Sequence, residues 1–146
     1  MKPAWTLIAN STHARLLQQQ PGEPMVVLKS FEHAQGRSKI SELADDRMGH
    51  ESADGSYGGT SFQPRVDAKR KEHEHFAHEL AEYVEQEAQA GRFASITLFA
   101  SSPFLGELKA ALGDATRRVL SGTHDLDLTA VGLTELERRI AHELAH

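Results

Sequence analysis

Short apolar runs separated by polar turn residues open the chain and predict three β-strands. Residues 5–9 combine aromatic and β-branched side chains, which favour a buried first strand. Residues 14–18 and 25–31 flank the turn sequence Gln-Pro-Gly-Glu-Pro at 20–24, and this arrangement favours a hairpin of strands two and three. We therefore expect three strands before the chain turns polar.

The longest helical pattern runs from about Pro64 to Gln89. Pro64 suits a first helical turn, and Gly91 ends the pattern. Charged residues separate apolar residues that recur at helical spacing, as in a helix packed along a sheet. The apolar stripe consists of Val66, Phe76, Ala77, Leu80, Tyr83, Val84 and Ala88.

The second half predicts two more strands and two more helices. Residues 94–100 form an apolar run expected at the centre of the sheet, and residues 118–121 predict a fifth strand. A helix between them is expected to be capped by Ser102, to have Pro103 in its first turn, and to end at Gly113. Its expected buried face consists of Leu105, Leu108 and Leu112.

A closing helix is expected near the end of the chain. Residues 134–137, Thr-Glu-Leu-Glu, have the spacing of a capping box. Its expected apolar face consists of Leu133, Leu136, Ile140 and Leu144.

Length and composition favour a single domain over residues 1–146 in a reducing compartment. The chain has 146 residues, of which 39% are hydrophobic, and it has no cysteine. Its first apolar run is too short for a signal peptide, and no run approaches the roughly 18 apolar residues of a membrane span. We expect a cytoplasmic protein that does not enter membranes. The net charge of −5 disfavours DNA coating and leaves only local contacts with nucleic acid.

Three groups of residues match metal-site patterns, and we interpret neither of the two histidine groups as a metal site. His142, Glu143 and His146 match HExxH, but the second histidine is the last residue and no third ligand follows. Among His73, His75 and His78, the first falls with the apolar stripe and the other two on the opposite side of the helix. The third group is a pair of aspartates. We expect neither a metal nor a cofactor.

Asp125 and Asp127 are carboxylates at a spacing of two. This spacing suits a metal-dependent nuclease, and a polar strand edge or loop explains it equally well. Both interpretations stay open from the sequence.

A polar, glycine-bearing stretch from about residue 33 to residue 63 joins the third strand to the long helix. Connections of this length are unusual within compact domains and are more often functional or disordered. Gly58 and Gly59, just before the helix, allow backbone angles closed to other residues. We expect a mobile loop there, mounted on a rigid helix.

Residues 58–65, Gly-Gly-Thr-Ser-Phe-Gln-Pro-Arg, resemble the loop and helix that carry the Gly-Gly-Gln motif in the middle domain of archaeal and eukaryotic class-one peptide-chain release factors. The order of strands and helices resembles bacterial relatives of that domain, and among them the family named host attachment protein, or protein required for attachment to host cells. Residues 5–10 with 14–15, and residues 41–43 with 46–47, are the other places that match.

The resemblance implies a three-layer α/β domain with a mixed five-stranded sheet and flanking helices, similar to ribonuclease H-like proteins. It also implies a loop that probes the ribosome or a tRNA end. Thr60 stands where release factors have the glutamine that helps to place water at the peptidyl-tRNA ester, which weakens the case for hydrolysis. Asn10 ends the first strand where ribonuclease H-like nucleases need an acidic metal ligand.

Together these observations favour a non-catalytic protein that binds the ribosome or RNA. The contacts would come from Gly58, Gly59 and Thr60 and from the basic residues Arg65, Lys69, Arg70 and Lys71, although a solvated helix start explains the basic residues as well. One alternative is a peptidyl-tRNA hydrolase in which the Gly58 and Gly59 amides hold an oxyanion and Thr60 holds water. Another is a protein-interaction module that acts indirectly on host attachment. The oligomeric state stays open.

Overall fold

The computed structural model of the chain describes residues 2–33 and 62–145, with the side chains of all of these except 62–70. The expectations for residues 34–61 of the loop, including those for Gly58, Gly59 and Thr60, therefore lie outside the described residues. At the ends of the expected loop, His33 is buried and residues 62 and 63 already belong to the long helix.

Five strands form one mixed sheet in the order β3-β2-β1-β4-β5. β1, β4 and β5 run parallel, and the predicted hairpin of β2 and β3 is confirmed as an antiparallel pair beside β1. The first strand, rather than the fourth, holds the central position, because the hairpin adds on one side of it and β4 and β5 add on the other. The strands are β1 (Ala4–Ala9), β2 (His13–Gln19), β3 (Val26–Glu32), β4 (Ser95–Ala100) and β5 (Leu120–Asp125).

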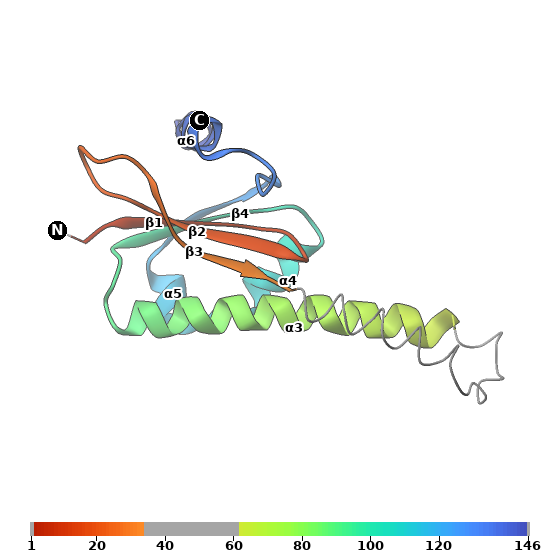
Figure 1. Cartoon of the computed structure of the whole chain (residues 1–146). Helices are drawn as coiled ribbons and strands as arrows, with labels where there is room; N and C mark the ends of the chain where they lie inside the picture. Colours follow the sequence, from red (N-terminus) through yellow and green to blue (C-terminus); the bar gives the residue numbers. More distant parts are fainter. Residues whose placement is uncertain (1, 34–61, 146) are drawn as a thin grey trace.

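Helices cover both faces of this sheet, so the expected three-layer α/β architecture is confirmed (Figure 1). Three helices lie on one face and the fourth lies on the other. Within the described residues, no helix combines the length and the apolar character needed to cross a membrane. The helices are α3 (Phe62–Gln89), α4 (Phe104–Ala111), α5 (Asp114–Arg118) and α6 (Leu133–Leu144).

Alternation along the strands divides the apolar side chains between two cores, because successive side chains of a strand point to opposite faces. Trp5 and Leu7 of β1 pack under α3 and α4, whereas Ile8 packs under α6. The predicted stripe of α3 supplies the first core with Phe76, Ala77, Leu80 and Val84, all at most 1% exposed.

The start and end of α4 differ from the sequence prediction. Pro103, not Ser102, occupies the N-cap position, and no side chain caps the helix. Ser102 instead donates hydrogen bonds to Asp125 from its amide and its hydroxyl, at 3.1 and 2.8 Å. Gly113 does not cap α4, which ends at Ala111, but is the N-cap residue of α5, a helix that the sequence did not predict. The fifth strand accordingly begins later, at Leu120.

The predicted capping box of the last helix is wrong. Gly132 is the N-cap residue of α6, and Thr134 lies within the helix, which leaves no side-chain cap. Glu137 instead accepts a hydrogen bond from the Met25 amide, at 3.2 Å. The apolar face is only partly buried, since Leu136 and Ile140 are buried but Leu133 and Leu144 remain 40% and 53% exposed.

Candidate functional site

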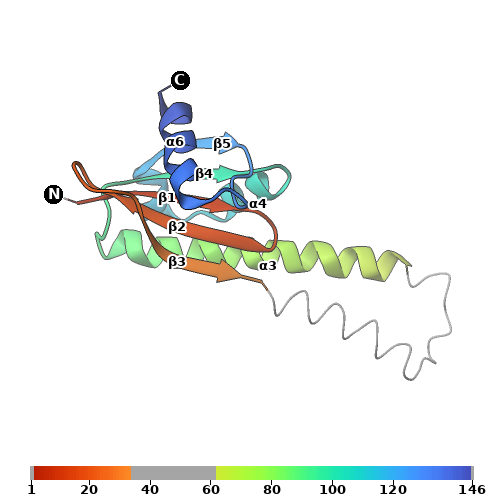
Figure 2. The same cartoon turned by 45° about the horizontal axis from the view of Figure 1, so that its top comes forward.

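The N-terminal part of α3 projects beyond the ends of the strands (Figures 1 and 2). The four basic residues predicted to contact RNA, Arg65, Lys69, Arg70 and Lys71, fall in the first ten residues of this helix. The side chain of Lys71 is exposed, and those of the other three lie outside the described side chains. The structure thus places these four basic positions on the projecting part of α3.

A histidine–glutamate pair fixes the base of this projection. His33, which directly follows β3, lies with Nε2 2.9 Å from Oε1 of Glu72 on α3. The His33 ring stacks on Phe76 at a centroid distance of 4.9 Å and is only 8% exposed. The end of β3 is therefore joined to α3 where the helix leaves the sheet.

The histidines of α3 lie where the helical spacing predicts. His73 is partly buried, whereas His75 and His78 are exposed. Among the described residues, no group of three or more histidine, cysteine or acidic side chains is arranged to hold a metal ion. His142 and Glu143 lie in the last turn of α6, and His146 lies outside the described residues.

A polar network occupies the carboxyl end of the central strand. Asn10 accepts hydrogen bonds from the amides of Thr12 and His13, at 2.9 and 2.8 Å, and so forms the turn between β1 and β2. Its own Nδ2 donates to Asp127 at 3.3 Å and to Thr129 at 2.9 Å, both in the connection from β5 to α6. Open α/β sheets commonly bind ligands at the carboxyl ends of their parallel strands.

Each of the two aspartates that suggested a nuclease is engaged within the fold. Asp125 holds Ser102, and Asp127 accepts the amide and the hydroxyl of Thr129 at 2.9 and 2.6 Å. Burial raises the pKa of Asp127, but the hydrogen bonds from Thr129 and Asn10 outweigh it and leave the pKa lowered. Asp125 is the last residue of β5, and Asp127 lies in the connection that follows. The pair therefore fits the strand edge and loop that the sequence analysis gave as one of two interpretations.

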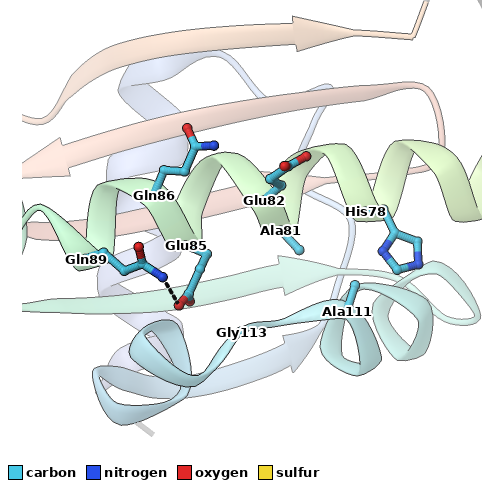
Figure 3. A pocket seen from close by; sticks show the side chains of 8 residues that line it. All are labelled: His78, Ala81, Glu82, Glu85, Gln86, Gln89, Ala111 and Gly113. Atoms are coloured by element: carbon cyan, nitrogen blue, oxygen red, sulfur yellow. Dashed lines mark hydrogen bonds between the residues drawn. The ribbon is translucent and has the colours of Figure 1, made fainter.

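An open groove of about 510 Å³ lies between α3 and the segment that joins α4 to α5 (Figure 3). Acidic, amide and imidazole groups of α3 line one wall, and Ala111 and Gly113 line the other. Glu85 crosses the groove. It accepts hydrogen bonds from the amides of Ala115 and Thr116, at 3.2 and 3.0 Å, and from the Thr116 hydroxyl at 2.8 Å.

Glu85 therefore supplies the negative charge that the first turn of a helix attracts. Burial raises its pKa, but the hydrogen bonds from Gln89, Thr116 and Ala115 outweigh this effect and lower the pKa to about 2. Gly113 permits the contact, since a Cβ atom there would collide with the Glu85 carboxylate. The sequence indicated only that Glu85 lies off the apolar stripe, and its partners lie 30 and 31 positions away.

Comparison with known proteins gives one family. None of the curated proteins matches the chain. The model of the family described as "Protein required for attachment to host cells" matches residues 5–140, which include four strands in full, β1 apart from its first residue, and most of α6. The chain therefore belongs to the family of proteins required for attachment to host cells.

Proposed function

We propose that this protein is a non-catalytic, cytoplasmic binding protein that contacts RNA on the ribosome through the projecting start of α3. Its net charge of −5 disfavours binding along DNA. The observation that carries the proposal is the projection itself, whose base is fixed by His33 and Glu72 and whose first ten residues include four cations. A helix that extends beyond its domain can enter a groove or a crevice that the rest of an acidic protein would avoid.

Phosphate contacts by such a helix would act through the release of counterions, which makes binding sensitive to salt. The chain carries a net charge of −5, so attraction to RNA has to come from a local concentration of positive charge. Residues 65–71 supply this concentration, with four basic residues and one acidic residue. The likeness of residues 58–65 to the release-factor loop supports the ribosome as the source of the RNA, and it rests on sequence alone.

Co-sedimentation with ribosomes at about 50 and about 200 mM salt tests the proposal. We expect the wild-type protein to sediment with ribosomes at the lower salt concentration and to be released at the higher one. Charge reversal by Lys69→Glu, Arg70→Glu and Lys71→Glu should weaken sedimentation and flatten its salt dependence, by about one unit of slope for each lost phosphate contact.

The matched control is a second triple variant, Lys109→Glu, Arg118→Glu and Arg138→Glu, which changes the net charge equally at exposed positions of α4, α5 and α6. It should still sediment, because its substitutions lie away from the projection. Equal loss in both folded variants would reduce the effect to net charge. Unchanged binding by the α3 variant would return its cations to the role of a solvated helix start.

Two further assays separate the alternatives. Cleavage of peptidyl-tRNA by the wild-type protein, lost in Thr60→Val, would replace the binding proposal with the hydrolase. Without cleavage, equal ribosome binding by the wild type, by Thr60→Gln and by the Gly58→Ala, Gly59→Ala double variant would remove the loop from the contact. Purification of one stoichiometric protein partner, without ribosome binding, would favour an interaction module that acts indirectly on attachment.

A further inference from the structure

A pocket of about 410 Å³ lies over β2 and β3, next to the connection from β5 to α6. Its volume falls within the range of small-molecule sites. Five polar residues contribute to its lining, namely His13, Arg15, Ser30, Glu32 and Thr129. The strand register sets them out in two pairs, because Arg15 lies opposite Ser30 and His13 lies opposite Glu32.

Arg15 is a fixed cation within this pocket. Its Nη2 donates to the carbonyl oxygens of Leu128, Thr129 and Val131, at 3.2, 2.9 and 2.6 Å, so one end of the guanidinium is anchored. Within the described part of the chain, Nε and Nη1 have no hydrogen-bond acceptor, although a guanidinium carries five N–H donors and stays charged. The anchored group therefore retains three donors for a ligand.

The charges around Arg15 indicate which ligand fits. Glu32 lies 3.1 Å from Nε2 of His13, so this carboxylate is directed to the imidazole, whereas Arg15 is held by carbonyl groups alone. Ser30 and Thr129 also line the pocket, and the Thr129 hydroxyl already donates to Asp127 at 2.6 Å and accepts from Asn10 at 2.9 Å. A partly buried cation with unused donors, together with the Ser30 hydroxyl on the same lining, matches an anionic oxygen group.

We propose that this pocket binds a small molecule through a carboxylate or phosphate group held by Arg15. The negative charge of Glu32 on the same lining favours a group with a single negative charge over a doubly charged one. This site lies on the face of the sheet opposite α3 and does not depend on binding of RNA.

Titration of the full-length, isotope-labelled protein with acetate and, separately, with inorganic phosphate tests the proposal by amide chemical shifts, with chloride at equal ionic strength as the reference. We expect saturable shifts at Ser30, Glu32 and Thr129, with a dissociation constant of about 1 mM for such small probes. Saturation by acetate alone identifies a carboxylate, and saturation by phosphate alone identifies a phosphate group.

Two variants decide whether Arg15 carries the binding. Ser30→Glu places a carboxylate opposite Arg15 at an exposed position and should weaken binding at least tenfold without unfolding the protein. Ser121→Glu, the same change at an exposed position of β5, should bind as the wild type does. Arg15→Gln should also lose binding, with the amide spectrum showing whether the fold persists. Absence of saturation by both probes, or equal binding by Ser30→Glu, would overturn the proposal.

Discussion

Glu85 shows how a charged residue on the outer side of a helix can become part of the fold. Its carboxylate joins α3 to the first turn of α5, where two backbone amides would otherwise lack a helical partner. The interaction replaces the capping side chain that α5 lacks, since its N-cap residue is Gly113. Glu85 and Gly113, which are distant in sequence, thus together cap the start of the five-residue helix α5.

We predict that Glu85→Gln lowers the free energy of unfolding at pH 6 by about 1 kcal/mol, the usual cost of losing a cap. The folded pKa of about 2 lies below the ordinary glutamate pKa of 4.5, so ionised Glu85 stabilises the folded state. That contribution is complete above about pH 4.5 and is lost as the pH falls through about 2. Urea denaturation between pH 6 and pH 2.5 should therefore show the two proteins converging in acid.

Glu82→Gln, one turn earlier on α3, provides the control because Glu82 is exposed and makes no hydrogen bond with α5. It should unfold as the wild type does at both ends of the pH range. An equal loss in Glu82→Gln would attribute the effect to the charge of α3 and not to the cap.

Gly113→Ala tests the same contact from the other side. The added Cβ would meet the carboxylate of Glu85 and displace it from the Ala115 and Thr116 amides, at a cost of about 1 kcal/mol. Because both substitutions break one interaction, their effects should not add. Urea denaturation of both single variants and the double variant measures this coupling, and full additivity would show that Gly113 acts independently of Glu85.

At the scale of elements, periodicity predicted most of the fold. The five strands and α3 were predicted from apolar patterns along the chain, and the structure confirms them, with the fifth strand beginning two residues later than predicted. The ends of the helices were harder to predict. Ser102 and Thr134 both have side chains that can cap a helix, but Ser102 binds Asp125 and Thr134 lies within α6. Sequence spacing cannot distinguish a capping serine from one that binds a neighbouring strand end.

The same limit applies to the candidate sites. The sequence identified Arg65, Lys69, Arg70 and Lys71 as a basic group, and the structure adds that their helix projects beyond the sheet. The sequence did not single out Arg15 as a pocket residue, because the three carbonyl groups that anchor its side chain lie 113 to 116 positions away. Contacts across such separations depend on the strand order and not on local pattern.

Helix α6 gives a direct test of how burial divides one apolar face. Leu136 is fully buried, so Leu136→Ala should cost about 2–5 kcal/mol of unfolding free energy through lost burial and a residual cavity. Leu133, on the same face but 40% exposed, should cost less than about 1 kcal/mol when changed to alanine. Chemical denaturation compares the two variants, and equal costs would mean that α6 packs differently along its length.

At the scale of the whole molecule, one sheet serves two apolar cores. The core under α3 and α4 is the larger, and the second consists of residues that α6 covers, among them Ile8, Leu17 and Phe99. Because β1 and β4 contribute side chains to both cores, disrupting the packing of one core should also destabilise the other.

Truncation tests this dependence. A chain that ends at Val131 lacks α6 and should expose Ile8 and Phe99, bind a hydrophobic dye and lose its cooperative thermal transition. A chain that ends at Leu144 retains the helix and serves as the control. A sharp thermal transition in the shorter protein would show that the larger core suffices for the native fold.

The pairing of His33 with Glu72 has a consequence for how this family can vary. The chain leaves the sheet after His33 and returns at Glu72, and these two residues lie within hydrogen-bond distance of each other. The two residues that flank positions 34–71 are therefore in contact with each other. Such a segment can change in length or be exchanged without altering the register of a single strand. The sheet can then stay unchanged while substitutions, insertions or deletions in residues 34–71 change what the protein binds.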